Sequence, residues 1–212
     1  GTLPDSWREV LYVLLEKPKS DPRFLNQRRE IALMPQDSKM AGHVSKRTVY
    51  QKVAGRIGKQ QVGWVRGYGA TDAGLVLANT IQAAQRRRKA LFVLYIDLAT
   101  FFPSINRKSL SVAEVFAGIP PEVPLLAWRI YGRADDKDDG VRCRYDTAAG
   151  LSPPVKFYMG ELMGDVLSPD KAKLLLHSVI AAIHLHCKGV GVFGEETQRR
   201  LEQAAYADDW VG

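Results

Sequence analysis

The 212-residue sequence contains only two cysteines, Cys143 and Cys187, and they do not form a Cys-x-x-Cys pair. This scarcity argues against a disulfide framework and favours reduced thiols in an intracellular protein. An initiator methionine and a signal peptide are also lacking, which predicts a segment of a longer protein. No apolar run approaches the roughly 20 residues that a membrane-spanning helix requires, so no contact with a membrane is expected.

Positive charge is concentrated in the first part of the chain. Residues 1–89 contain 17 Lys and Arg and 7 Asp and Glu, a net charge of +10. Residues 90–212 contain 13 Lys and Arg and 16 Asp and Glu, a net charge of −3. A basic first part is suited to holding polyphosphate or a nucleic-acid backbone, and a mildly acidic second part to collecting cations. Uneven surface charge without a function is the alternative explanation.

Three aspartates stand at the ends of apolar runs. Asp208 and Asp209 follow a short apolar run near the C-terminal end, and Asp97 closes another at residues 91–96. One strand end and one hairpin with these carboxylates can hold two Mg²⁺ ions about 4 Å apart, with Mn²⁺ as an alternative metal. One ion would activate an attacking 3′-hydroxyl, and the other would hold a triphosphate. The pattern predicts a two-metal nucleotidyl-transfer site.

The apolar spacing predicts interleaved helices and strands, which is typical of an α/β or α+β fold. Helices are expected over residues 4–15, 46–57, 72–89, 106–116, 171–187 and 195–205. Strands are expected at residues 31–34 and 91–97, and a strand or tight hairpin at residues 205–211. Thr71 or Asp72 is expected to cap the helix over residues 72–89.

Two further patterns bear on a nucleotide site. Gly164 permits a close backbone approach, and Ser168 and Pro169 predict the start of a helix soon after it. Phe102 follows Asp97 by five residues, and a bulky ring there could lie beneath an incoming sugar and exclude a 2′-hydroxyl. A Gly-x-Gly-x-x-Gly at residues 189–194 lacks a βαβ frame and is expected to be a flexible link.

Taken in order, these segments resemble the fingers and palm of a reverse transcriptase, of the non-LTR retrotransposon or group II intron type. The matched segments are Lys17 with residues 26–33, then residues 61–64 with 69–73, and the three palm segments 95–105, 164–169 and 206–209. The resemblance implies a right-hand polymerase with a fingers-like basic region at 1–89 and a palm-like catalytic region at 90–212. It also implies an antiparallel palm sheet backed by helices, and no thumb within the chain.

The resemblance implies a role for each matched residue. The implied catalytic and metal-binding residues are Asp97, Asp208 and Asp209, which would hold two Mg²⁺ ions. The implied nucleotide-binding residues are Arg29, assisted by Lys17 or Arg28, together with Phe102 and Gly164. The implied template or primer contacts are Ser168, Pro169 and Tyr206. The partners would be an RNA template, a DNA primer and dNTPs, and the compartment would be the nucleus if the chain derives from a eukaryotic mobile element.

The sequence alone is also compatible with two other functions. An RNA-dependent RNA polymerase shares the same fold, although Phe102 and the Ala-Asp-Asp triplet argue against it. A degenerate polymerase-like module that only binds nucleic acid is the other. It is favoured by Met163, where the family usually has Gln, by Glu30, where Pro is usual, and by the missing thumb. The intact carboxylate trio opposes it. No processive synthesis is expected from the 212-residue chain alone.

Overall fold

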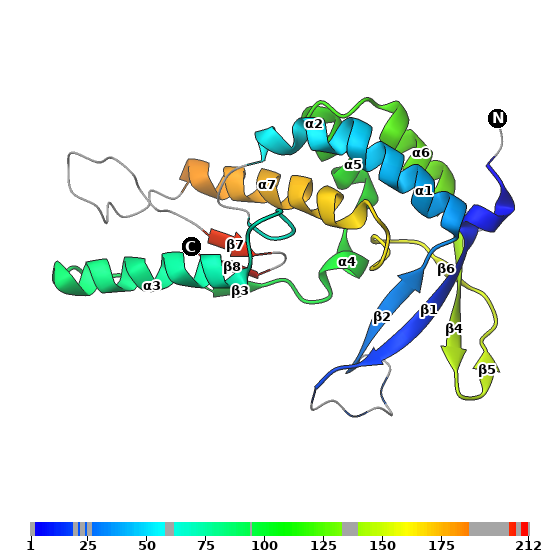
Figure 1. Ribbon diagram of the computed structural model, residues 1–212, viewed down its shortest axis with the longest axis horizontal. Coiled ribbons are helices and arrows are strands. Elements are labelled where there is room, and N and C mark those ends of the chain that lie inside the picture. Colours follow the sequence, from blue (N-terminus) through cyan, green and yellow to red (C-terminus); the bar gives the residue numbers. More distant parts are fainter. Residues whose placement is uncertain are drawn as a thin grey trace. The chain divides into compact units, whose positions relative to one another are not determined.

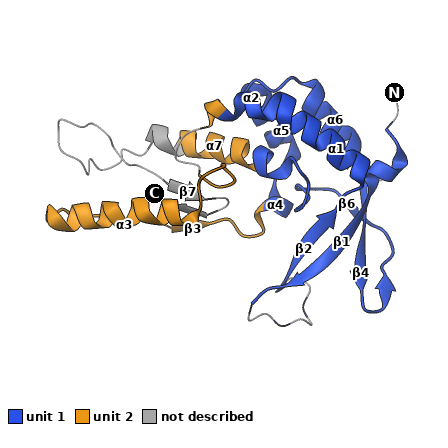
Figure 2. Ribbon diagram, viewed as in Figure 1, with its two compact units in different colours: residues 1–54, 102–171 blue, residues 55–101, 172–212 orange. Residues whose placement is uncertain are grey.

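The computed structural model describes residues 3–18, 21, 24, 27–57, 62–93, 95–132, 140–186, 204–206 and 209–211. The chain divides into two compact units, and each unit is built from two separate segments (Figure 2). Unit 1 comprises residues 1–54 and 102–171, and unit 2 comprises residues 55–101 and 172–212. Helices and strands are mixed, as the sequence predicts. The proposed fingers and palm boundaries stay a prediction.

A five-stranded mixed sheet runs through unit 1 (Figure 1). Its strands are β1 (Glu9–Glu16), β2 (Arg28–Leu33), β4 (Val141–Thr147), β5 (Gly150–Leu151) and β6 (Val155–Phe157). Strand β1 pairs antiparallel with β2 and parallel with β4, and β4 pairs antiparallel with both β5 and β6. Strand β2 confirms the strand expected at residues 31–34 and extends it toward the N-terminus.

Strand β1 shows that the helix expected over residues 4–15 is wrong. Only a short 3₁₀ turn, Asp5–Arg8, precedes the strand. Val10 and Tyr12 are buried on one face of β1, and neighbouring strands lie on both sides of it. Branched and aromatic side chains pack well on such a pleated surface, so the strand pairing overrides the helical spacing of the apolar residues.

Unit 1 also contains helices, one of which packs against the core beside this sheet. They are α1 (Gln36–Ser45), α2 (Gln51–Val53), α5 (Arg107–Phe116) and α6 (Glu122–Tyr131), with α4 (Phe101–Ser104) at the junction of the units. The core consists of Val10, Tyr12, Ala32, Met34, Tyr131, Val141, Cys143 and Leu162, with Ala127 and Ile130 of α6 packed against it. Helix α5 confirms the helix expected at residues 106–116, and Asn106 caps it by accepting hydrogen bonds from the amides of Lys108 and Ser109.

Two details of unit 1 differ from the sequence-based expectation. Helical structure begins at Gln36 rather than at residue 46, and a π-helical turn, Lys46–Tyr50, joins α1 to α2.

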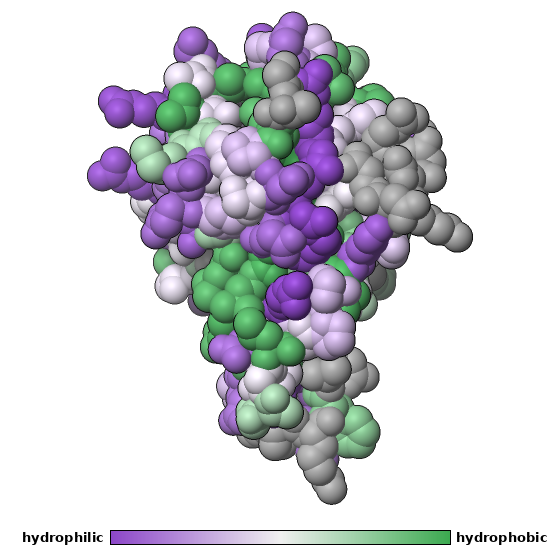
Figure 3. Space-filling model, turned by 90° about the vertical axis from the view of Figure 1, so that its right-hand side faces the viewer, coloured by the Kyte–Doolittle hydropathy of each residue, from purple (hydrophilic) through white to green (hydrophobic). Residues whose placement is uncertain are grey.

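Part of the surface is apolar: Leu15, Leu33, Leu151 and Val155 of the sheet are exposed. On the face of the molecule shown in Figure 3, apolar side chains form a patch that hydrophilic side chains border.

Unit 2 combines a long helix with a small sheet. Helix α3 (Ala70–Arg86) packs against β7 (Ala204–Tyr206), which pairs antiparallel with β8 (Asp209–Val211), and β8 pairs antiparallel with β3 (Tyr95–Asp97). This confirms the helix expected at residues 72–89 and the hairpin expected at 205–211, whereas β3 is shorter than the strand expected at 91–97. The N-cap of α3 is Gly69, whose amide donates to the Asp72 carboxylate, so Thr71 and Asp72 are not the N-cap.

Helix α7 (Ser168–His186) begins in unit 1 and continues in unit 2, and it confirms the helix expected at residues 171–187. The link expected at residues 189–194 and nearly all of the helix expected at 195–205 lie outside the described residues, but Ala204 and Ala205 belong to strand β7. Within the described part of the chain, no helix combines the length and the apolar character that crossing a bilayer would require.

Candidate active site

Two of the three predicted metal ligands lie on neighbouring strands of unit 2. Asp97 is the last residue of β3 and Asp209 is the first residue of β8, and the antiparallel register pairs the two positions directly. Directly opposite residues in an antiparallel pair have Cβ atoms about 4.5–5.5 Å apart. The fold therefore brings together two acidic positions that are distant in the sequence.

The third predicted ligand, Asp208, lies outside the described residues. It belongs to the connection between β7 and β8, whose register pairs Tyr206 with Asp209. Among the residues whose placement is described, no three His, Cys, Asp or Glu side chains gather as a metal site. Metal binding by the aspartates stays a prediction.

The chain turns sharply between Asp97 and helix α4. Thr100 has a φ of +50°, in the left-handed region that a branched residue seldom adopts. Such a conformation costs about 1–3 kcal/mol and persists only where the surrounding structure enforces it. Phe102 follows in α4 and is buried, and its carbonyl accepts a hydrogen bond from the amide of Glu161 at 2.9 Å. Its predicted selection of deoxyribonucleotides stays a prediction.

Strand β2 carries the residues predicted to bind the triphosphate. Arg28 pairs with Glu16 and Arg29 with Leu15 across β1, so the two arginines point to opposite faces of the sheet. Glu30 shares its face with Arg28 and not with Arg29. Its charge is therefore placed away from Arg29, although the two residues are adjacent in the sequence.

Glu30 has a neighbour of opposite charge. Burial raises the pKa of Glu30, and the ammonium of Lys17, just after β1, opposes that rise. The positive charge of Lys17 therefore acts on Glu30, on the face of the sheet that Arg29 does not share. Triphosphate binding by Lys17, Arg28 and Arg29 stays a prediction.

The turn at Gly164 lies against strand β2. The amide of Ala32 donates a hydrogen bond to the carbonyl of Met163 at 2.6 Å. Gly164 has a φ of +117°, and a Cβ at this position would lie 2.4 Å from the carbonyl oxygen of Ala32. Only glycine fits so close to another backbone in this conformation. The predicted close approach is confirmed, and its partner is the strand that carries Arg28 and Arg29.

Helix α7 starts as predicted, at Ser168 with Pro169 in its first turn. The Ser168 side chain is buried, and its hydroxyl donates to the Glu161 carboxylate at 3.4 Å. Ser168 thereby attaches the start of α7 to the segment that precedes the Gly164 turn. The predicted template or primer contacts of Ser168, Pro169 and Tyr206 are not visible in this arrangement and stay predictions.

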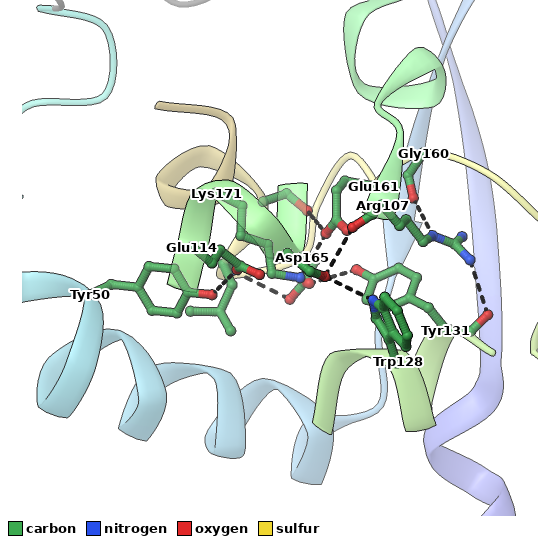
Figure 4. Close-up of polar contacts among 12 residues, drawn as sticks. Tyr50, Arg107, Glu114, Trp128, Tyr131, Gly160, Glu161, Asp165 and Lys171 are labelled. Carbon is green, nitrogen blue, oxygen red and sulfur yellow. Dashed lines mark hydrogen bonds and ion pairs between the residues drawn. The ribbon is translucent and has the colours of Figure 1, made fainter. Parts of the chain in front are cut away.

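A buried polar network in unit 1 adds residues that the sequence did not single out (Figure 4). Its members are Tyr50, Arg107, Glu114, Tyr131, Glu161, Asp165 and Lys171. Lys171 forms an ion pair with Glu161 at 2.9 Å, and the two side chains are 1% and 2% exposed. Burial by itself lowers the pKa of Lys171, but the carboxylates of Glu161, Glu114 and Asp165 more than offset this and raise it to about 12.

Arg107 holds three backbone carbonyls at once. Its guanidinium donates to Gly160 at 2.8 Å, to Tyr131 at 3.2 Å and to Phe157 at 3.2 Å. The same group lies over the rings of Tyr131 and Phe157, at 4.9 and 5.4 Å from their centroids. Burial lowers the pKa of Arg107, while Glu161 opposes that effect. Arg107 therefore ties β6, the end of α6 and the segment leading to Gly164 together.

Comparison with known proteins finds the fold and little else. No model of a known protein family matches the chain. No curated protein matches it either. Solved structures do match: apo telomerase from Candida tropicalis truncated from the C-terminal domain has a TM-score of 0.58 and 10% identity, over 97% of this chain and 43% of that one.

Two further telomerase structures, both in complex with a TWJ fragment of telomeric RNA, are similar to this chain. The Candida tropicalis complex has a TM-score of 0.59 and 12% identity, over 97% of this chain and 36% of that one. The Candida albicans complex has a TM-score of 0.57 and 12% identity, over 100% of this chain and 39% of that one. The chain thus spans about two fifths of the length of these telomerases. It has the fold of part of telomerase.

Proposed function

We propose that this chain is the fingers and palm part of an RNA-directed DNA polymerase, of the non-LTR retrotransposon or group II intron type. The observation that carries the proposal is the direct pairing of Asp97 with Asp209 in the small antiparallel sheet of unit 2. Like charges directly opposite on two strands are destabilising, so this pairing calls for a cation. The telomerase-like fold supports the same assignment.

The proposed metal ligands are Asp97, Asp208 and Asp209, and the metal is Mg²⁺ or Mn²⁺. Carboxylate oxygens are the ligands that these ions prefer, and the paired register offers two such residues side by side. Bound ions would activate the primer hydroxyl and neutralise charge on the triphosphate. The chain's own contribution is to orient the two reacting groups, which is the main requirement of phosphoryl-type transfer.

The proposed nucleotide site belongs to unit 1. There, Arg29 supplies positive charge on one face of the sheet, Lys17 or Arg28 would supply it from the other, and Phe102 excludes ribonucleotides. Gly164 lets its turn approach the strand that carries the arginines. Template RNA and primer DNA are the proposed partners. The basic first part of the sequence and the RNA present in two of the matched telomerase structures support them.

The test is primer extension by the full-length protein on an RNA template. Asp97→Asn should lower Mg²⁺-dependent dNTP incorporation by at least about a hundredfold, because metal-derived charge stabilisation is worth several kcal/mol. Asp146→Asn removes an exposed carboxylate from β4 of unit 1 and should leave the rate unchanged. Near-normal incorporation by Asp97→Asn would refute the site.

The same assay separates the two alternative functions. Incorporation of NTPs in preference to dNTPs would identify an RNA-dependent RNA polymerase. Salt-sensitive RNA binding by a wild-type protein that extends no primer would identify a nucleic-acid-binding module.

A further inference from the structure

The hydroxyl of one buried tyrosine holds the Gly164 turn. Tyr131 is the last residue of α6 and is 3% exposed. Its hydroxyl donates a hydrogen bond to the Asp165 carboxylate at 2.6 Å, and Asp165 is the residue immediately after Gly164 (Figure 4). Hydrogen bonds to a charged acceptor are among the strongest in proteins. The position of Asp165 is therefore coupled to the end of α6.

Asp165 organises the turn around it. Its amide donates to the carbonyl of Leu162 at 3.1 Å, and its second carboxylate oxygen lies 3.4 Å from the amide of Leu167. Between these contacts, Met163 accepts the hydrogen bond from Ala32 of strand β2. A movement of Asp165 would therefore move the backbone that lies against β2.

Tyr131 is itself fixed on several sides. Its carbonyl accepts a hydrogen bond from Arg107, and the Arg107 guanidinium lies over its ring. The Lys171 ammonium, which is paired with Glu161, lies 5.1 Å from the centroid of the same ring. Burial, together with the nearby Asp165, raises the pKa of Tyr131 well above its usual value, so the hydroxyl keeps its proton at neutral pH. The tyrosine is thus a rigid donor.

We propose that Tyr131 is a positioning residue for the nucleotide pocket, which through Asp165 fixes the turn of residues 163–167 against strand β2. This inference rests on the proposed function, because it takes the turn and β2 to be two walls of the dNTP site. Tyr131 touches no reacting atom in this proposal. Its loss should weaken nucleotide binding and leave the chemical step almost unchanged.

Two matched variants test the proposal in the full-length protein. Tyr131→Phe keeps the ring beneath Arg107 and Lys171 but removes the hydrogen bond to Asp165. Tyr50→Phe is the control, because Tyr50 is equally buried and lines the same cavity, but its hydroxyl donates to the buried carboxylate of Glu114 rather than to Asp165. Each variant loses one hydroxyl that is bonded to a carboxylate, so their general effects on stability should be similar.

Amide hydrogen exchange measures directly how firmly the turn of residues 163–167 is held. In Tyr131→Phe, exchange at Ala32, Asp165 and Leu167 should become at least about tenfold faster, the change expected from losing one charge-assisted hydrogen bond. In Tyr50→Phe, exchange at these amides should stay within about twofold of the wild type, because their hydrogen bonds are intact. Unchanged exchange in Tyr131→Phe, or an equal increase in both variants, would overturn the proposal.

Steady-state kinetics then measure the effect of each variant on nucleotide binding and turnover. Tyr131→Phe should raise the KM for dNTP about tenfold with kcat within about twofold, whereas Tyr50→Phe should change neither. Faster exchange without a change in KM, or a fall in kcat alone, would contradict the positioning role. A wild-type protein that incorporates no dNTP would refute the proposed function. The exchange measurement would then still decide whether Tyr131 holds the turn.

Discussion

The two units place their charged groups in opposite ways. In unit 1 one group of charges is buried and matched within the protein, as in the pair of Lys171 with Glu161. In unit 2 Asp97 is exposed, and its partner across the sheet is another acidic position, Asp209. A buried, matched network fixes backbone positions, whereas two acidic positions paired across a sheet have no opposite charge in that pairing. Under the proposed function, unit 1 would set geometry and unit 2 would supply the charge that binds metal.

Helix α7 allows this comparison within one element, because Lys171 lies in unit 1 and Lys173 in unit 2. Lys171→Met should lower the free energy of unfolding by about 3–5 kcal/mol, since it leaves the Glu161 carboxylate buried without its cation. The ammonium of Lys173 donates to a neutral group, the carbonyl of Trp64 at 3.4 Å. Loss of this hydrogen bond should contribute about 1 kcal/mol to the cost of Lys173→Met. Urea unfolding measures both values, and equal losses would contradict the contrast between the units.

Two glycines of unit 1 allow the cost of a steric clash to be distinguished from the cost of an unfavourable φ. Gly160 has a φ of +83°, and a Cβ there would lie 2.4 Å from the carbonyl oxygen of Pro103. Gly150 has a φ of +102°, but a Cβ there would meet nothing within 4 Å. Gly160→Ala should thus destabilise the protein by at least about 3 kcal/mol, and Gly150→Ala by about 1–2 kcal/mol. Thermal unfolding checks the difference, and similar losses would show that the packing around Gly160 is loose.

Buried tyrosines make unit 1 sensitive to alkali. Burial raises the pKa of Tyr50, and the nearby Glu114 raises it further. The unfolded chain ionises this hydroxyl near pH 10 while the folded chain keeps the proton, so its contribution to stability is complete below about pH 10 and is lost as the pH rises. Above that pH, Tyr50→Phe should make the fall in unfolding free energy shallower by about 1.4 kcal/mol per pH unit. Urea titrations at pH 9 and pH 11 test this, and an unchanged slope would show that Tyr50 also ionises in the folded state.

Local sequence predicts some elements of this protein well. Helix α3, helix α5 and the start of α7 at Ser168 each depend on residues close together in the chain. Strand β1 was misassigned because its apolar spacing also fits a helix, and only pairing with β2 and β4 decides between the two. The strands at residues 141–157 have no sequence-based prediction; β4 pairs with its neighbours β5 and β6, but it joins the main sheet only through the distant strand β1.

In the candidate site, too, residues in a local sequence pattern could be predicted, whereas residues that meet only after folding could not. Asp97, Asp208 and Asp209 are predicted as ligands because carboxylates behind apolar runs form a recognisable local pattern, and their metal binding stays a prediction. The network around Tyr131 was missed because Arg107, Glu161 and Lys171 have unremarkable neighbours in the sequence and meet only after folding. The sequence did contain one indication of the network. Lys171 lies on a largely apolar helix, and a buried lysine in such a helix is rare unless it is paired.

The most direct test of the central claim is Mn²⁺ binding to the full-length protein, followed by electron paramagnetic resonance. If the positions opposite each other on β3 and β8 share divalent ions, the wild type should bind Mn²⁺, and Mg²⁺ should compete for the site. Asp97→Asn and Asp209→Asn should weaken binding to a similar degree, whereas Asp146→Asn should not. Wild-type-like Mn²⁺ affinity in both Asp97→Asn and Asp209→Asn would contradict the account.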